Sequence, residues 1–561
     1  MPPSVLAIAQ IAFVVAVLAA AYVPLGDAMA RLFTREHPRR GEGAFYRMCR
    51  IDAHGDQGWV TYAGALLAFS FVSVLSLYGL QRLQGVLPLG GDLGAVSPAV
   101  AFNTAISFVT NTNWQSYVPE TTMSNLVQPV GLAVQNFLSA AVGISVAIAL
   151  TRAIARVTTG SGIGNFWVDL TRATVYVLFP LAFLFAALLL TQGVVQSLSS
   201  GFAATGIDGA AQHVALAPAA SQEAIKMLGT NGGGVFAANS AHPFENPTPL
   251  SNIAQIVAML LIPVALTRTF GTMIGNRRQG LTLLAVMTIL WAAMLALATW
   301  AESRTAGAAA QAAGAMSEGK EVRFGIPASV LYAVSTTGTS TGAVNSAHDS
   351  YSAAGGGVLL LNMLFGEIAP GGVGSGLYTL LVLAIVAVFV GGLLVGRTPE
   401  FLGRRIGRRE VTLAASVILV MPALVLAGAA ITAILPATLG ALGNSGDPGS
   451  PSAAHGFSEI LYAYTSAANN NGSAFGGLTV TSDWFQGSLG VAMLLGRFLP
   501  IVLVLALAGA FARQRRSEPS PGAIVTTGPL FTGLVTGTVA LVSALTFFPA
   551  LALGPLAEAL Q

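Results

Sequence analysis

Long uncharged apolar runs alternate with short polar connections along nearly the whole chain. A helix of about 20 apolar residues is long enough to cross the hydrocarbon core of a bilayer. Two candidate runs are each interrupted by one arginine, residues 253–274 by Arg268 and residues 487–511 by Arg497. Eight more contain no charge: 4–24, 59–80, 128–150, 173–190, 281–300, 378–395, 411–435 and 524–551. The pattern predicts ten membrane-spanning helices.

Composition supports this interpretation. Hydrophobic residues make up 54% of the chain and charged residues 9%, against roughly 25% charged residues in an average soluble domain. The first run has no basic segment before it, so we expect an uncleaved helix and not a signal peptide. We predict one all-α integral membrane unit without a sizeable soluble domain.

Four polar stretches rich in Gly, Asn, Ser and Thr separate pairs of these runs. Each follows an apolar segment of about 8 to 11 residues, too short to cross and suited to a re-entrant helix. These segments are residues 99–109, 221–228, 327–335 and 457–465. Within residues 229–247, three successive glycines permit backbone conformations that a Cβ forbids. Irregular backbone at membrane depth is tolerated only where it is buried in protein or lines a watery path.

The polar stretches recur at regular intervals. If Asn111, Gly232, Gly342 and Gly472 are equivalent, the spacing is 110 to 130 residues. Parallel repeats are related by an axis along the membrane normal. We therefore predict four membrane–pore-loop–membrane repeats around a pseudo-fourfold pore, with one extra helix at each end. The repeats are 59–171, 172–280, 281–410 and 411–523, and the extra helices lie in 1–58 and 524–561.

Basic residues are divided unevenly between the two sets of connections. Twenty of the 26 lysine and arginine residues lie in odd-to-even connections, five lie in the others, and Arg497 lies within a span. Cytoplasmic connections of membrane proteins carry the excess of Lys and Arg. We expect both termini and all four polar stretches on the side away from the cytoplasm.

Four such loops from one chain could form a single ion filter. A potassium filter replaces the ion's hydration shell with rings of backbone carbonyl oxygens, which requires small residues on the pore axis. Ordinary turns have the same composition, but four turns behind four re-entrant segments on one side favour the filter. The candidate K⁺-binding residues are Thr110, Asn111, Thr230, Asn231, Gly232, Ser340, Thr341, Gly342, Asn470, Asn471 and Gly472.

A broken helix is expected below the third loop. Residues 355–376 should form the seventh span or its first half, but Gly366, Pro370, Gly371 and Gly372 interrupt them. Proline removes a helical hydrogen bond and glycine loosens the chain. The segment could therefore gate a pore, or it could be a plain kink.

Two charged positions extend this hypothesis. Arg497 is the only charge deep in an apolar span, and an intramembrane ionisable residue is a functional hypothesis by default. It could limit how far an ion descends, pair with Glu367, or do both. Arg397, at the end of the seventh span, is placed to meet another subunit.

Several other functions find no support in the sequence. The chain contains neither the G-x-x-x-x-G-K-[ST] phosphate loop nor the H-E-x-x-H zinc motif, so we expect no bound nucleotide. The histidines have no metal-ligand spacing. The positive-inside bias explains the basic connections, and the expected surroundings are a lipid bilayer and not nucleic acid.

Several strings resemble one family: VTNTNWQ, GTNGGG, NSAHPFENPTP, GGVGSG and NNGSAF. The chain resembles the potassium-binding A subunits of the bacterial Kdp potassium-transporting ATPases, members of the superfamily of potassium transporters. The resemblance runs from the first span to the last. It implies a filter at the residues above, with Asn113 close to it and Gln115 helping to set affinity. Thr341 departs from the family, where cysteine is expected.

The resemblance also implies a location and partners. The chain would lie in the bacterial inner membrane and pass K⁺ to the catalytic B subunit of the pump, a P-type ATPase. A single-span C subunit and a small accessory membrane peptide would complete the pump. The chain itself would not be catalytic. The alternatives are a channel-like potassium uptake protein gated by a soluble ring and, from another class, a membrane enzyme with a polar site between helices.

Overall fold

The computed structural model describes residues 3–90, 93–304, 317, 319–443, 455–518 and 522–560. Among these residues, ten helical segments are long and apolar enough to cross a membrane, which confirms the predicted number. One of them is continuous from α7 (Phe166–Arg172) into α8 (Phe179–Thr191). The others are α1 (Pro3–Phe33), α3 (Trp59–Leu83), α6 (Val134–Ala155), α10 (Pro249–Met273), α11 (Arg277–Glu302), α15 (Ser375–Leu394), α16 (Arg408–Ile434), α19 (Asp483–Ala512) and α20 (Pro529–Leu551).

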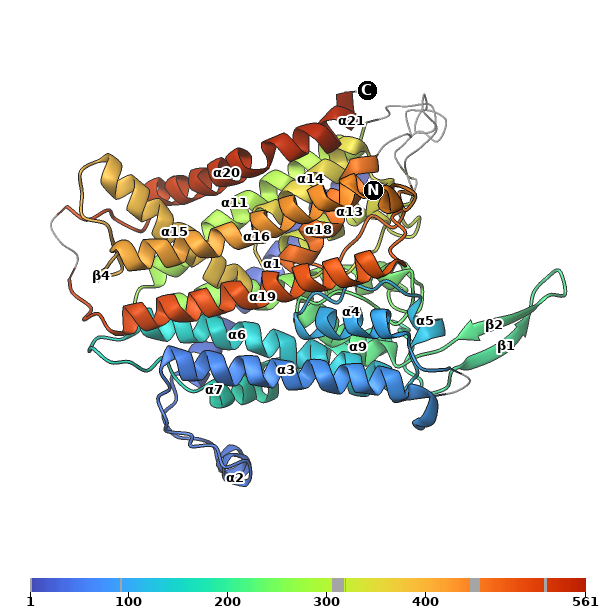
Figure 1. The fold of residues 1–561 in the computed structure, drawn as a ribbon, viewed down its shortest axis with the longest axis horizontal. Coiled ribbons are helices and arrows are strands. Elements are labelled where there is room, and N and C mark those ends of the chain that lie inside the picture. The colour runs from blue at the N-terminus through green and yellow to red at the C-terminus, as the bar shows by residue number, and fades with distance from the viewer. Residues whose placement is uncertain are drawn as a thin grey trace.

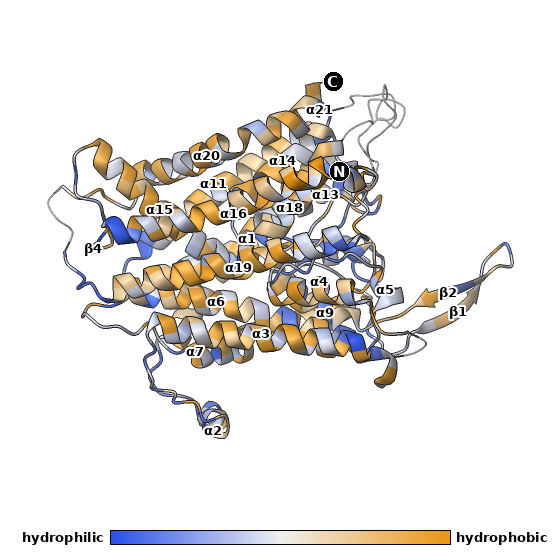
Figure 2. Ribbon diagram, in the orientation of Figure 1, coloured by the Kyte–Doolittle hydropathy of each residue, from blue (hydrophilic) through white to orange (hydrophobic). Residues whose placement is uncertain are grey.

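The long helices run side by side as one bundle (Figure 1). Both termini lie at the end of the bundle from which the β1–β2 hairpin projects. An even number of spans requires this, because the chain must finish on the side where it started. Figure 2 shows hydrophobic residues along the lengths of the helices, with hydrophilic residues collected near their ends. The chain is therefore built as a multi-pass membrane protein.

Four short helices occupy the half of the bundle nearest that hairpin (Figure 1). They are α4 (Pro98–Val109), α9 (Ala219–Leu228), α13 (Gly325–Gly338) and α18 (Gly456–Asn469). All four predicted re-entrant segments are thus helical. The third and fourth continue past the predicted ends, because Thr336, Thr337 and Ser466 stay helical although the sequence turns polar there.

The helix predicted to be broken is discontinuous. The helix α14 (Ala353–Leu364) ends before the break, and α15 begins at Ser375. Residues 365–374 between them form no helix. Positive φ angles of 82° at Gly366 and 94° at Gly371 account for the interruption, since an α-helix requires φ near −63°.

The first span extends beyond its predicted end at residue 24, since α1 continues to Phe33. The predicted run stops at residue 24, just before the charge of Asp27, but the helix continues past both. Arg268 on α10 donates to both Asp27 carboxylate oxygens at 2.8 Å. Pairing the two charges between packed helices offsets part of the cost of taking them out of water.

Two short β-hairpins accompany the predicted all-α bundle. A hairpin of β1 (Gly201–Thr205) and β2 (Ala211–Ala215) extends away from the bundle, and a smaller one joins β3 (Glu400–Phe401) to β4 (Arg404–Arg405). Both are connections and not spans. The other α-helices in the described part of the chain are short: α2 (Arg40–Met48), α5 (Pro119–Thr122), α17 (Pro436–Leu439) and α21 (Ala557–Leu560).

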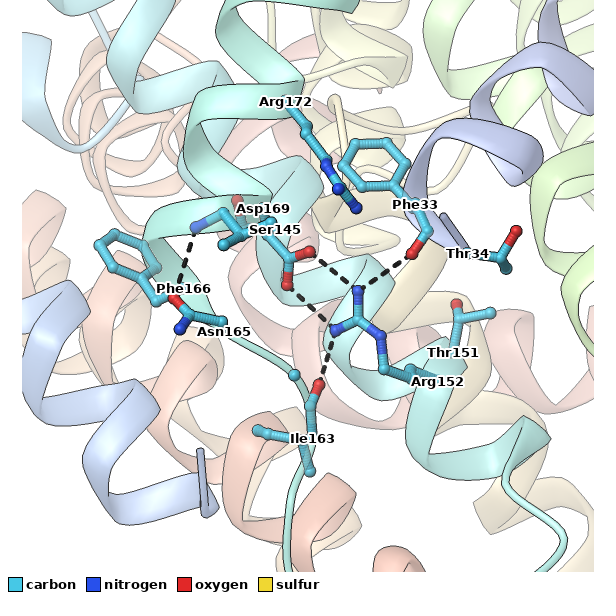
Figure 3. Close-up of polar contacts among 12 residues, drawn as sticks. Phe33, Thr34, Ser145, Thr151, Arg152, Ile163, Asn165, Phe166, Asp169 and Arg172 are labelled. Carbon is cyan, nitrogen blue, oxygen red and sulfur yellow. Dashed lines mark hydrogen bonds and ion pairs between the residues drawn. The ribbon is translucent and has the colours of Figure 1, made fainter. Parts of the chain in front are cut away.

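At the end of the bundle opposite the β1–β2 hairpin, where α7 lies (Figure 1), an ion pair and neighbouring hydrogen bonds hold the helices together (Figure 3). Arg152 on α6 donates to the two carboxylate oxygens of Asp169 on α7, at 2.8 and 3.0 Å. It also donates to the Ile163 carbonyl oxygen at 2.7 Å. The Tyr62 hydroxyl donates to Asp169 at 3.0 Å. These contacts join α3, α6 and α7, so the helices that surround the first polar loop are held at their far ends.

Candidate ion-binding site

All four short helices end in the same backbone turn. In each, one residue with positive φ follows the helix, and the next amide donates to the carbonyl oxygen five residues earlier. The positive-φ residues are Asn111, Thr230, Ser340 and Asn470. The hydrogen bonds are Thr112 to Ser107, Asn231 to Lys226, Thr341 to Thr336 and Asn471 to Ser466, at 2.8 to 3.2 Å. Four copies of one irregular turn support the predicted fourfold repeat.

This turn corrects the assumed equivalence of the loops. Residue types paired Asn111 with Gly232, Gly342 and Gly472, but the structure places Asn113 at that position. Asn113 has φ of 55°, a left-handed conformation in which asparagine is enriched several-fold. The predicted alignment of the first loop was therefore wrong by two residues. Asparagine, like glycine, adopts positive φ angles, so Asn111 and Asn113 were both candidates for the glycine position.

The four loops meet around Gly232. A Cβ added at Gly232 would lie 2.9 Å from the carbonyl oxygens of both Thr112 and Thr341, and 3.3 Å from that of Asn471. These three oxygens belong to the other three loops and occupy equivalent positions in them. The predicted residues of all four loops are therefore brought together in space, although they lie far apart in the sequence.

The carbonyl oxygens at this meeting point have no protein donors. Within the described residues, no N–H or O–H group donates to the carbonyl oxygens of Thr112, Asn231, Thr341 or Asn471. All four residues are buried. Buried carbonyl groups without a partner are uncommon in folded proteins. A dehydrated cation is a ligand that such oxygens can coordinate.

Side chains join the four loops in the order 2, 1, 4 and 3. Asn111 donates to the Thr230 carbonyl at 2.8 Å, joining loops 1 and 2. Ser340 donates to the Asn469 carbonyl at 3.2 Å, joining loops 3 and 4. Asn470 donates to the Thr112 hydroxyl at 2.9 Å, joining loops 4 and 1. The side chains are engaged in these bonds, which supports a role for the backbone oxygens as the groups that face the ion.

Sequence reasoning missed a buried amide cluster behind the first loop. Asn231 donates to Asn111 at 2.7 Å, and Ser139 on α6 donates to the same Asn111 oxygen at 2.8 Å. Asn113 donates to Asn136, also on α6, at 2.5 Å. The available signal was polarity, since Asn136 and Ser139 are among the few polar residues of a mostly apolar span.

Gln115 lies between the first two loops. Its side-chain amide donates to the Gly234 carbonyl at 3.1 Å, and its side-chain oxygen accepts from the Gly234 amide at 3.0 Å. A Cβ at Gly233 would lie 3.1 Å from the Gln115 side chain. Gln115 therefore adjoins the residues that follow Gly232, and it is only partly buried.

An uncharged contact joins the segment after the third loop to the short helix α18. His348 Nδ1 and the Tyr462 hydroxyl lie 2.9 Å apart. Burial and the nearby Lys320 ammonium lower the pKa of His348 to about 3. The ring is therefore neutral at physiological pH, and this contact carries no charge that could repel a cation.

The break between α14 and α15 lies directly beneath the loops. The amides of Ala369 and Gly371 both donate to the Gly338 carbonyl at the end of α13, at 3.2 and 2.7 Å. The Val373 amide donates to the Thr230 hydroxyl at 2.8 Å. A Cβ added at Gly372 would lie 2.8 Å from the Cβ of Ser340. A Cβ added at Gly143 of α6 would lie 2.3 Å from the Val373 carbonyl oxygen. The segment is packed so closely that only glycine fits at these points.

A cavity of about 90 Å³ lies beside this segment. Glu367, Arg497, Ser340 and Asn470 all line it, together with residues of α15, α16 and α20. The Ser340 hydroxyl donates to one Glu367 carboxylate oxygen, and the other is buried without a hydrogen-bond partner. This partnerless oxygen beneath the loops is available as a ligand for a cation.

Arg497 and Glu367 share the cavity without touching. In the described part of the chain they form no ion pair, and Arg497 Nη2 instead donates to the Ser139 carbonyl of α6 at 3.2 Å. The structure does not bring Arg397 to this cavity. Arg397 is exposed beyond the far end of α15, next to the exposed residues Leu393 to Val395.

The fold and the site together define a helical membrane protein in which four re-entrant loops meet at one buried, oxygen-lined point. The family described as "Potassium-transporting ATPase A subunit" matches residues 12–560, and the chain belongs to it. The family resemblance seen in the motifs is thus confirmed.

Curated relatives match over the full length. The chain is 69% identical over 561 residues to the potassium-transporting ATPase potassium-binding subunit of Rhodococcus opacus (strain B4), with all of both chains covered. It is 54% identical over 560 residues to the protein of the same name from Streptomyces coelicolor, again with full coverage. The fold is similar to that of the potassium transporter TrkH from Vibrio parahaemolyticus. That match has a TM-score of 0.53 and 15% identity, and it covers 90% of this chain and 98% of the other.

Proposed function

We propose that this chain is the potassium-binding subunit of an ATP-driven potassium pump, and that its four loops form a carbonyl filter for K⁺. The observation that carries the proposal is the convergence of partnerless carbonyl oxygens from Thr112, Thr341 and Asn471 on Gly232. Backbone oxygens without protein donors suit a weakly hydrated cation. The names of the full-length relatives support K⁺ as that ion.

The proposed filter extends over the predicted residues of each loop, with Asn113 added at the glycine position. The division into four repeats at residues 59–171, 172–280, 281–410 and 411–523 belongs to the same proposal. The arginine distribution supports an orientation with the loops and both termini outside the cytoplasm. The membrane would be the bacterial inner membrane.

The route below the filter is proposed to turn sideways. The segment from Gly366 to Gly374 blocks the direct route, since it is bonded to the ends of the loops from below. The cavity beside it reaches α16 and α20. We propose that K⁺ leaves through this cavity towards a separate P-type ATPase chain, which hydrolyses ATP. A single-span membrane protein and a small membrane peptide complete the proposed complex.

Copurification in mild detergent tests this assignment. We expect a P-type ATPase chain to purify with the protein, and the complex to hydrolyse ATP in a K⁺-dependent manner. A cytoplasmic ring-forming protein in its place would instead support the channel-like alternative.

Gln115→Arg is expected to raise the K⁺ concentration for half-maximal uptake. A positive charge about 8 Å from the ion costs about 2 kcal/mol at an effective dielectric constant of 20, and each 1.4 kcal/mol is tenfold in affinity. We therefore expect an increase of tens of fold. Gln115→Met, which loses the bonds to Gly234 without adding charge, should have a smaller effect. An unchanged concentration for both variants would remove Gln115 from the site.

Cysteine labelling should place the two hairpins on opposite sides of the membrane. In a Cys49→Ser background, cysteines at the exposed positions Ala210 and Arg405 should react with membrane-impermeant reagents from outside and from the cytoplasm, respectively. The arginine-rich side should be cytoplasmic. Labelling of both positions from one side would contradict the arrangement of spans.

A further inference from the structure

Lys226 is a lysine without exposed surface in the last turn of α9, four residues before Thr230, the positive-φ residue of the second loop. Its ammonium nitrogen lies 2.5 Å from Glu223 Oε2 and 2.9 Å from Glu245 Oε2. It also donates to the side-chain oxygen of Asn239 at 3.3 Å and to the Ser240 hydroxyl at 3.1 Å. A buried charge is tolerated when its geometry is good and its hydrogen bonds are satisfied, and all of these partners are buried.

Asn239 connects Lys226 to two of the four loops. Its side-chain nitrogen donates to the Gly233 carbonyl oxygen, directly after Gly232. Its side-chain oxygen also accepts from the backbone amide of Val344, two residues after Gly342, at 3.2 Å. A single side chain thus fixes the outer backbone of loops 2 and 3 relative to each other. Lys226 donates to that same oxygen and so holds the Asn239 amide in place.

Glu245 fixes the following residues of loop 2. Its Oε1 atom accepts from the amides of Val235 and Phe236, both at 2.9 Å. A Cβ on Gly234 would lie 2.8 Å from the same oxygen. Since Lys226 pairs with the other oxygen of this carboxylate, its ammonium group supports the backbone from Gly233 to Phe236 through two separate side chains.

We propose that Lys226 is a positioning residue for ion selectivity, which fixes the spacing of the outer carbonyl groups in loops 2 and 3 through Asn239 and Glu245. The proposal rests on the carbonyl filter proposed above. Discrimination among cations of similar charge depends on the size of the carbonyl cage or on the number and field strength of its oxygens. Both quantities change when the loop backbones can shift.

An alternative role for the cluster is purely electrostatic. The three groups sum to one negative charge when Glu223 is ionised, which would attract cations of every kind, and to zero when it is protonated; burial raises the pKa of Glu223 to about 8. Two variants separate the roles. Lys226→Met combined with Glu223→Gln removes the ammonium group and leaves a net charge of −1 on Glu245. Glu223→Gln alone gives a net charge of zero and leaves Lys226 bonded to Asn239 and Glu245.

The test uses the complete pump in cells whose K⁺ uptake depends on it, with uptake of K⁺ and Rb⁺ measured in competition. The Lys226→Met/Glu223→Gln variant should lose about tenfold of the preference for K⁺, which equals about 1.4 kcal/mol. Glu223→Gln should keep the preference. Ser240→Ala, which removes one Lys226 contact but leaves Asn239 bonded, is the matched control and should also keep it. The amount of assembled complex and its melting temperature are measured for each variant.

The proposal is overturned if the double variant assembles normally and keeps its preference, or if Glu223→Gln loses as much preference as the double variant. If the double variant fails to assemble, selectivity is measured in Asn239→Gly instead. This variant removes the side chain that bonds loops 2 and 3, and glycine tolerates the φ of 54° at this position. Retained preference in Asn239→Gly would then overturn the proposal. The preference of Gly232→Asp for K⁺ is measured in parallel. If that preference is unchanged, the carbonyl filter itself is contradicted. If Gly232→Asp loses the preference but the Lys226 and Asn239 variants keep it, only the role of Lys226 is contradicted.

Discussion

Replacing Gly232 with aspartate is expected to abolish the preference for K⁺ over Rb⁺ and ammonium. Even the Cβ of the new side chain would lie 2.9 Å from two carbonyl oxygens and 3.3 Å from a third. Contacts of this length force the loops apart. The carboxylate then adds a negative charge among the oxygens, so the size of the cage and its field both change. We expect a loss of at least about tenfold, or about 1.4 kcal/mol.

The measurement is competitive uptake of K⁺, Rb⁺ and ammonium by the assembled complex. Gly476→Asp is a matched control, because Gly476 follows the fourth loop in an exposed position with no atom within 4 Å of an added Cβ. It introduces the same charge near the same mouth without entering the ring of carbonyls. Equal selectivity in Gly232→Asp and Gly476→Asp would show that Gly232 is not part of a filter.

The bundle could be predicted from sequence because a bilayer imposes a length on every span. Ten runs gave ten spans, and the polar stretches marked the four short helices. The ends of the helices were harder. The first predicted span ended at residue 24, before the charge of Asp27, yet the helix passes this residue because Arg268 on α10 pairs with it. A pairing partner 241 residues away leaves no local trace in the sequence.

The sequence predicted the type of site, four converging polar loops, but not the alignment of the first loop with the other three. Glycine marks the axial position in loops 2, 3 and 4, so those three could be aligned by residue type. Loop 1 has Asn113 there, and Asn111 two residues earlier offered an equally plausible match. The turn that resolves the choice is a backbone feature, the amide of Thr112 bonded to the Ser107 carbonyl. Backbone hydrogen bonds of this kind cannot be read from residue types.

The supporting side chains could not have been assigned from sequence either. Lys226 was counted among the few basic residues of the outer connections, where a lysine is normally solvated. Its spacing of three from Glu223 suggests a helical ion pair, but Glu245 and Asn239 reach it only because the chain after Gly234 folds back over α9. Burial of the whole group distinguishes it from a surface pair, and burial depends on the tertiary fold.

Removing the segment beneath the filter is expected to convert the complex into a passive K⁺ pathway. A filter alone conducts in both directions, whereas a pump must keep its ion from leaking back. The segment is bonded to Gly338 and Thr230 directly under the loops. Deleting residues 367–371, which joins Gly366 to Gly372, should remove the plug together with the carboxylate of Glu367. K⁺ should then cross sealed vesicles without ATP, at a rate well above that of the intact complex.

The matched control is a deletion of equal length at residues 206–210, the exposed turn between β1 and β2. It should leave the vesicles tight, provided that both complexes assemble to the same level. Arg497→Ala should increase passive flux in the same direction but less, because the charge is lost while the backbone segment stays. Arg497 faces the cavity from α19 and contacts the Ser139 carbonyl, so it opposes a cation below the filter without closing the route. If the complex lacking residues 367–371 assembles and its vesicles stay tight, the barrier lies elsewhere, and the cavity beside Glu367 is not held closed by this segment.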